Sequence, residues 1–190
     1  MIQVRKSVFE TNSSSTHSIC ISKEYVEPGD FINFHLGDFG YDDEEVSAAD
    51  YLYTAIMTME DAEEKLDKLK DILDDYGVQY EFEEPKLKKY DWGNGVNEYY
   101  LDNGYIDHAC EVWPFVENVL SDEDLLMRLL FGDSFVYTGS DNCSEENPKC
   151  YAAYDTYWED YQDEDGEWHT RDLPNPNHDE EHYEYFFKGN

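Results

Sequence analysis

Acidic side chains dominate this chain, and any fold that it adopts must accommodate them. Its 190 residues include 46 Asp and Glu against 13 Lys and Arg, which gives a formal net charge of -33. A net charge of about 2 to 8 is enough to keep a small domain soluble. The field of a more acidic surface repels nucleic acids and anionic membranes and attracts cationic surfaces. We therefore expect no direct nucleic-acid binding and no membrane binding. The expected partner is a cationic protein groove or a cation.

The chain nevertheless has enough apolar residues to form a core. Hydrophobic residues make up 40% of it and aromatic residues 16%, so its acidity does not indicate disorder. Its length suits one domain, because domains commonly run from about 50 to 250 residues. We predict a single domain over 1–190, with an α+β core at 1–140 and an acidic, aromatic extension at 141–190 packed on that core.

The spacing of the apolar residues predicts both strands and helices. Alternation predicts a strand at 2–9 and another at 17–22, with a Ser-rich loop between them. Helical spacing predicts two helices between Glu44 and Tyr76, the second ending at Gly77 in a left-handed cap. A further helix is predicted at 121–131, with Ser121 as its N-cap. The remaining predicted strands lie at 31–36, 78–84, 96–101 and 133–139 and close to the C-terminus.

These elements predict an α+β fold, with a mixed or antiparallel sheet and three or four helices packed on one side. Asp165-Gly166 lies between aromatic alternations and predicts a C-terminal β-hairpin. We expect this hairpin to carry acids on one face and aromatic side chains on the other.

The predicted hairpin is the main candidate for partner binding. Its carboxylates can imitate the phosphates of duplex DNA, which carries about one charge per 1.7 Å of axis. Aromatic side chains beside them can supply the buried contacts that dominate interface energies. The candidate partner-binding residues are Asp155, Trp158, Glu159, Asp160, Tyr161, Asp163, Glu164, Asp165, Glu167 and Trp168.

The stretch FETNSSSTHSICIS, from Phe9 to Ser22, offers a different candidate. Its hydroxyls can bind phosphate, or a Ser or Thr can pair with His17 as nucleophile and base. The alternative is that they only bond the backbone of their own turn. The candidate pocket residues for an enzyme are Glu10, Ser13, Ser14, His17, Asp107, His108 and Asp141.

Two groups of residues have side chains that could ligate a metal. Asp107, His108 and Cys110 have side chains that can ligate a metal, with His17 or Asp141 to complete the set. The Asp-His pair also suits a capped helix start or a surface loop. His169, His178 and His182 lie in a proline-containing tail that argues against a regular helix. We expect no metal and no cofactor.

Two features concern the compartment. The four cysteines fit reduced thiols better than a disulfide framework. The N-terminus lacks the apolar run of a signal peptide, and no stretch approaches the roughly 20 apolar residues that cross a bilayer. We expect a cytoplasmic protein.

The segments RKSVFETNSSSTHSICIS, SAADYLYTAI, GYIDH and SDEDLLMRLLFGDSFVYTGSDN resemble an uncharacterised family encoded by phages and mobile elements of Firmicutes. The likeness covers about the first three quarters of the chain and implies a phage context. Acidic phage proteins of this size are similar in kind to type II anti-CRISPR proteins and to DNA-mimicking anti-restriction proteins.

Three hypotheses follow. The first is an anti-defence inhibitor that binds the cationic nucleic-acid surface of a CRISPR effector, most readily of type II, in the bacterial host and blocks DNA binding or cleavage. The second is an enzyme acting on a nucleotide or phosphoester. The third is a virion or scaffold component. The sequence leaves the oligomeric state open.

Overall fold

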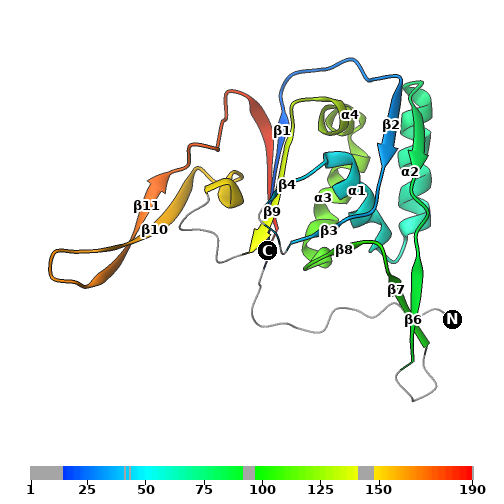
Figure 1. Cartoon of the computed structure of the whole chain (residues 1–190). Helices are drawn as coiled ribbons and strands as arrows, with labels where there is room; N and C mark the ends of the chain where they lie inside the picture. The colour runs from blue at the N-terminus through cyan, green and yellow to red at the C-terminus, as the bar shows by residue number, and fades with distance from the viewer. Residues whose placement is uncertain (1–14, 41, 43, 92–96, 141–147, 190) are drawn as a thin grey trace.

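A computed structural model describes residues 15–40, 42, 44–91, 97–140 and 148–189. Its centre is a four-stranded antiparallel sheet with the strand order β12-β1-β9-β4 (Figure 1). The bounds of its strands are Ser15–Ser22 for β1, Glu44–Glu45 for β4, Phe135–Ser140 for β9 and Tyr183–Gly189 for β12. The sheet therefore joins the first and the last described strands of the chain. The predicted strand at 2–9 lies outside the described residues.

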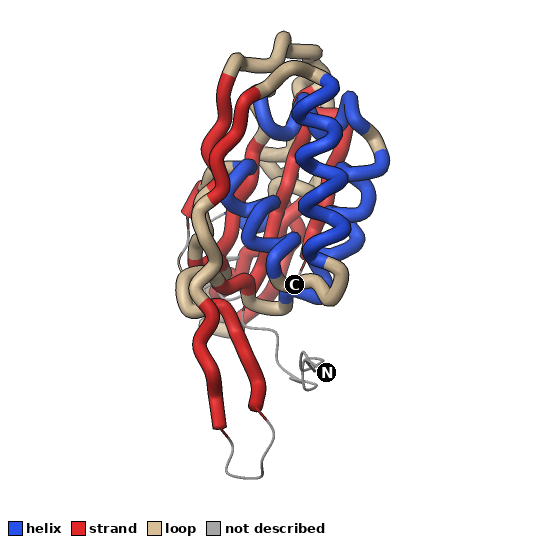
Figure 2. The backbone as a smooth tube through the Cα atoms, turned by 90° about the vertical axis from the view of Figure 1, so that its right-hand side faces the viewer, coloured by secondary structure: helices blue, strands red, loops and turns tan. Residues whose placement is uncertain are grey.

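Four helices lie on one side of this sheet (Figures 1 and 2), where α1, α3 and α4 contact it and α2 packs against α1 and α3. They are α1 (Ala48–Met57), α2 (Ala62–Asp75), α3 (Ala109–Ser121) and α4 (Glu123–Phe131). Ile19 and Ile21 of β1 belong to the same buried cluster as Leu52 of α1, Phe115 of α3 and Leu126 of α4. Burying such a side chain contributes about 1.5 to 3 kcal/mol. The core therefore lies between the sheet and the helices.

All eight residues of β1 are buried, including its polar ones. Both faces of this strand are covered, so alternation of apolar and polar residues is not required. The face away from the helices carries a short 3₁₀ helix, η2 (Pro148–Tyr151). There Ser18 Oγ accepts a hydrogen bond of 2.9 Å from the Ala153 N–H.

The cysteines differ from one another. Cys20 is a free, buried thiol, and burial raises its pKa to about 12. Cys150 is buried and disulfide-bonded, so the prediction of a reduced thiol is wrong for this residue. Cys143 lies outside the described residues.

The remaining strands form four separate pairs. Two are parallel: β2 with β5, and β3 with β8. Two are antiparallel hairpins that project from the body, β6–β7 and β10–β11 (Figure 1). The bounds are Phe31–Phe34 for β2, Asp38–Phe39 for β3, Gln79–Phe82 for β5, Leu87–Asp91 for β6, Asn97–Leu101 for β7, Tyr105–Ile106 for β8, Thr156–Gln162 for β10 and Trp168–Pro174 for β11. The predicted α+β class, with helices on one side and a C-terminal hairpin, is confirmed.

The helix predicted at 121–131 begins at Glu123, with its N-cap one residue later than predicted, and a helix that was not predicted precedes it. Ser121 ends α3, and Asp122 caps α4 by accepting a 3.1 Å hydrogen bond from the Leu125 N–H. A proline, Pro114, lies inside α3, and its ring weakens the sequence signal for a helix. His108 is the residue before α3, in the left-handed conformation with a φ of 51°, and its side chain makes no capping hydrogen bond.

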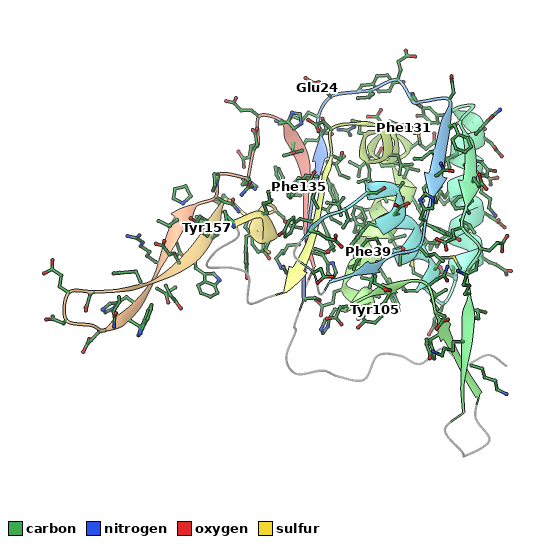
Figure 3. The ribbon with its side chains drawn as sticks, in the orientation of Figure 1. Glu24, Phe39, Tyr105, Phe131, Phe135 and Tyr157 are labelled. Carbon is green, nitrogen blue, oxygen red and sulfur yellow. The ribbon has the colours of Figure 1, made fainter. Side chains whose placement is uncertain are left out.

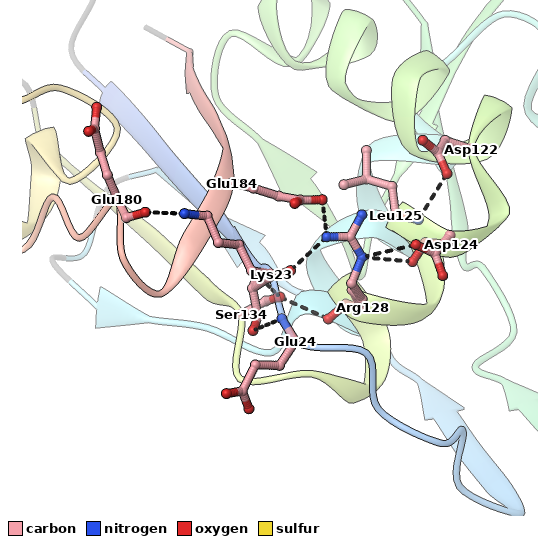
Figure 4. A network of polar contacts seen from close by, with 10 residues as sticks. Lys23, Glu24, Asp122, Asp124, Leu125, Arg128, Ser134, Glu180 and Glu184 are labelled. Atoms are coloured by element: carbon pink, nitrogen blue, oxygen red, sulfur yellow. Dashed lines mark hydrogen bonds and ion pairs between the residues drawn. The ribbon is translucent and has the colours of Figure 1, made fainter.

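One buried arginine ties α4 to the sheet (Figure 4). The Arg128 guanidinium donates to the Ser22 carbonyl of β1 at 3.0 Å, and it pairs with Glu184 of β12. Its Nε lies 3.4 Å from an Asp124 carboxylate oxygen on the same helix. Arg128 is only 6% exposed, so these bonds form where water competes weakly.

Among the described residues, no helix combines the length and the apolar character that crossing a bilayer requires.

Candidate functional site

The β10–β11 hairpin extends away from the sheet, so most of its length stands outside the core (Figure 1). Its base is anchored next to η2. Asn175, just after β11, donates from its side chain to the Tyr151 carbonyl at 2.7 Å and from its backbone to the Asp155 carbonyl at 2.8 Å. At the far end Gly166 adopts a positive φ of 84°, as the predicted Asp-Gly turn requires.

The register of the hairpin sets which side chains share a face. Residues directly opposite each other in an antiparallel pair lie on the same side, and successive pairs alternate. The tyrosine face carries Tyr157, Glu159, Tyr161, His169, Arg171 and Leu173. The tryptophan face carries Thr156, Trp158, Asp160, Gln162, Trp168, Thr170, Asp172 and Pro174. Both faces mix acids with aromatic rings, and Figure 3 shows side chains on both sides of the ribbon. The prediction of one acidic and one aromatic face is therefore wrong. Trp158 and Asp160 are two residues apart on β10 and therefore share a face, so aromatic and acidic side chains are not separated between the two faces.

Three of the acidic candidate residues form side-chain hydrogen bonds or ion pairs within the hairpin. Glu159 pairs with Arg171 at 2.5 Å. Asp160 accepts a 2.5 Å hydrogen bond from the Thr170 hydroxyl.

The third, Asp163, closes the turn. Its Oδ1 accepts from the backbone N–H of Glu167 at 2.9 Å and of Asp165 at 3.0 Å, and its Oδ2 lies 2.8 Å from His169 Nε2. The hydrogen bond from the Glu167 backbone, followed by that from the His169 side chain, lowers the Asp163 pKa.

The other acids of the candidate set are exposed: Asp155, Glu164, Asp165 and Glu167. The exposed aromatic residues beside them include Trp168, of which 71% is accessible, and Tyr161, of which 38% is accessible. Such large exposed rings are typical of interaction surfaces. The hairpin thus offers carboxylates at its tip and aromatic anchors along its strands.

The two groups of residues that were considered as metal ligands do not form clusters in the described part of the chain. Among the described residues, the donor atoms that come within 4.8 Å of one another as a group of three belong to Asp163, Glu167 and His169, at the hairpin turn. Asp107, His108 and Cys110 do not form such a group. His178 and His182 lie in the turn before β12 rather than on a helix. His178 instead lies 2.8 Å from the Ala152 carbonyl through Nδ1.

A second site lies at the end of β1 where the Ser-rich stretch enters the sheet. His17, 90 residues away from Asp107 in the sequence, donates through Nε2 to the Asp107 carbonyl at 2.9 Å. The Asp107 carboxylate accepts a 2.7 Å hydrogen bond from the Tyr105 hydroxyl and lies 3.9 Å from His108 Nε2. Three candidates for the enzyme pocket are thus brought together. The others, Glu10, Ser13, Ser14 and Asp141, lie outside the described residues.

The His17 ring is held in one tautomer. A carbonyl can only accept, so Nε2 carries the proton and Nδ1 is left with its lone pair. Burial lowers the His17 pKa to about 4, despite the opposing hydrogen bond to Asp107, so the ring is neutral at pH 7.

Buried polar atoms without a hydrogen-bond partner gather around this ring. Within the described part of the chain they include His17 Nδ1, the Tyr51 hydroxyl, the Thr138 hydroxyl and His108 Nε2. Thr138 lies directly opposite His17 in the sheet, and the Tyr51 ring centre is 5.7 Å from that of His17. Buried polar groups elsewhere, such as Thr54, Arg128 and Asn175, are bonded. An unpaired buried group calls for a bound water, an ion or a ligand as its explanation. Sequence reasoning missed Tyr51 and Thr138, because neither belongs to a motif.

No family model, curated protein or solved structure matches this chain. The phage context suggested by sequence resemblance therefore stays a prediction.

Proposed function

We propose that this protein is an acidic inhibitor that inserts its β10–β11 hairpin into the cationic nucleic-acid groove of a bacterial defence nuclease. A CRISPR effector, most readily of type II, is the expected target, and the host cytoplasm is the expected compartment. The observation that supports this proposal is the projection of an acidic hairpin with exposed aromatic rings away from the core. By occupying the groove, the hairpin would block DNA binding or cleavage.

Charge favours such a complex. From Asp155 to Pro174 the chain contains eight acidic residues and one basic residue, Arg171, which gives a formal charge of -7. A groove that binds a phosphate backbone presents Lys and Arg at matching density. Opposite potentials steer association and raise its rate, while the uncharged parts of the interface supply most of the affinity.

Shape favours it as well. The hairpin projects from the body as a two-stranded ribbon (Figure 1), so its exposed side chains can reach into a groove of a partner. Trp168, which is 71% exposed, can supply an aromatic contact at the groove wall, since Trp is enriched among the residues that dominate binding energy.

Affinity capture tests the proposal directly. The intact protein is immobilised and exposed to a panel of guide-loaded nucleases at low salt, and bound protein is then eluted along a salt gradient or with duplex DNA. We expect at least one nuclease to be retained, and to be released by either treatment, because salt screens the contact and DNA competes for the groove. Retention that neither salt nor DNA reverses would contradict a groove-binding mode. A panel in which no nuclease binds would contradict the proposed target class.

A second candidate, an enzyme acting on a nucleotide or phosphoester, is favoured by the unpaired buried atoms around His17. In this candidate His17 Nδ1 accepts a proton or hydrogen bond from the substrate, and Asp107 and His108 complete the site. Hydrolysis of nucleoside triphosphates and of bis(p-nitrophenyl) phosphate is measured for the intact protein and for His108→Ala. Turnover that is lost in the variant would support an enzyme. An inactive intact protein would remove this candidate for both substrate classes.

A further inference from the structure

We infer that the tryptophan face of the hairpin is a binding site for arginine side chains of the partner. The inference rests on the proposed function, because it concerns the same hairpin, and it goes further by naming the side chain that is recognised and the face that recognises it. The tyrosine face supplies the comparison, since it already holds an arginine of the chain itself.

On the tyrosine face a guanidinium lies between a ring and a carboxylate. The Arg171 guanidinium carbon lies 5.0 Å from the centre of the Tyr161 ring. Its Nε and one Nη lie 2.8 and 2.5 Å from a Glu159 oxygen. Both interactions suit the planar arginine head, which stacks on rings and forms paired hydrogen bonds with carboxylates. This face is therefore occupied, and its acid is largely neutralised.

The tryptophan face has the same components without the cation. Trp158 lies directly opposite Asp172, and the next pair on this face is Asp160 with Thr170. The pair after that on this face is Gln162 with Trp168, and Trp168 lies diagonally across the two strands from Asp160. Side chains in diagonal positions stand about 7 to 8 Å apart at their backbones, which is within reach of aromatic rings. None of the eight residues of this face is basic, so its two carboxylates have no guanidinium on the same face.

The exposure of this face also favours an external ligand. Trp168 is the most exposed of the large hydrophobic side chains among the described residues, at 71%, and Asp172 is exposed as well. Asp160 is held in place by its hydrogen bond from Thr170, so one acceptor is oriented before the ligand arrives. A guanidinium can stack on a tryptophan ring and pair with a neighbouring carboxylate at once.

Arginine is favoured over lysine for a physical reason. A lysine ammonium is a compact, strongly hydrated charge that gains from the acidic field alone. A guanidinium gains from the same field, and in addition it stacks on tryptophan, the ring that binds cations best. The arginine-rich walls of a nucleic-acid groove are therefore the expected partner of this face.

The test compares two peptides of equal charge. Hexa-arginine and hexa-lysine are titrated into the full-length protein by calorimetry, at a salt concentration that suppresses non-specific contacts. We expect hexa-arginine to bind about tenfold more tightly, a difference that two stacked guanidinium groups can supply. Equal affinities for the two peptides would overturn the inference.

Matched variants test whether residues of the tryptophan face produce the preference for hexa-arginine over hexa-lysine. Trp168→Ala and Asp172→Asn remove one ring and one carboxylate from the tryptophan face. Tyr154→Ala and Glu164→Gln are the controls, since Tyr154 is an exposed ring outside the hairpin strands and Glu164 is an exposed acid at the tip. Each tryptophan-face variant should lower the arginine preference at least threefold, whereas the controls should weaken both peptides equally or not at all. A preference that survives both tryptophan-face variants would contradict this site.

The two proposals can fail separately. An arginine preference that depends on Trp168, together with no captured nuclease, would retain the site and reject the nuclease target. A captured nuclease whose binding is unaffected by Trp168→Ala and Asp172→Asn would retain the target and reject this face.

Discussion

Replacement of Arg128 by alanine is expected to lower the free energy of unfolding by about 2 to 4 kcal/mol. The guanidinium connects α4 with β1 and β12 through the Ser22 carbonyl and Glu184, and it is almost fully buried. Without it the Ser22 carbonyl loses a donor, and the packing of the side chain is lost. Urea unfolding followed by circular dichroism measures the change.

The matched control is Lys70→Ala. Lys70 pairs with Asp67 three residues away on α2; the Asp67 side chain is 75% exposed and that of Lys70 34%. An exposed pair of this kind contributes about 0.2 to 0.5 kcal/mol, so the control should barely change stability. Equal, small effects of the two substitutions would contradict the role assigned to Arg128.

Acidification is expected to destabilise the protein through His17 by about 3 kcal/mol between pH 6.5 and pH 4. Burial lowers the His17 pKa from 6.5 to about 4 in the folded state. Between these values the unfolded chain binds a proton at this residue that the folded chain does not. The contribution is therefore fully present above pH 6.5 and is lost progressively as the pH falls to 4.

Other groups also titrate in this range, so the contribution of His17 must be measured as a difference in stability between the intact chain and a His17 variant. Urea unfolding at pH 7 and pH 4.5 is compared for the intact chain and for His17→Gln, which keeps a donor for the Asp107 carbonyl. The stability gap between the two proteins should shrink at the lower pH, because only the intact chain carries the penalty. A direct check is the ¹⁵N shift of the His17 ring, which should report a neutral ring from pH 7 down to about pH 5 and protonation only below that. An imidazolium signal at pH 6 would refute the account of this residue.

Local patterns predicted much of the fold. The helical spacing before Tyr76 corresponds to α1 and α2, and Gly77 ends the second helix with a positive φ of 71°. Alternation at 17–22 corresponds to most of β1, and the Asp165-Gly166 turn corresponds to the tip of the hairpin. Each of these elements is determined by residues close together in the sequence, so periodicity and turn-forming residues were sufficient to predict it.

Features that depend on distant pairing were not predicted. The two-residue strands β3 and β8 exist only because Asp38 pairs with Tyr105, far along the chain. The register of the hairpin decides which side chains share a face, and composition alone could not supply it. The proximity of His17 to Asp107 likewise depends on how α3 packs on the sheet, although the sequence had marked both residues as chemically notable.

The structure also changes the choice of residues for testing the hairpin. Asp163 was part of the acidic strip predicted from sequence, but its carboxylate closes the turn, so its replacement would disturb the fold of the tip. Glu164, Asp165 and Glu167 are exposed and can be changed without removing that contact.

Inhibition of a captured nuclease by the charge-reversed hairpin tests the central claim most directly. DNA cleavage is titrated with the intact protein, with Glu164→Lys/Asp165→Lys/Glu167→Lys, and with Glu64→Lys/Asp71→Lys/Asp75→Lys, an equal change of charge on exposed residues of α2. If the hairpin enters the groove, the hairpin variant should need at least about tenfold more protein for half-inhibition, whereas the α2 variant should remain within about twofold of the intact chain. Equal potency of the hairpin variant and the intact protein would contradict the account.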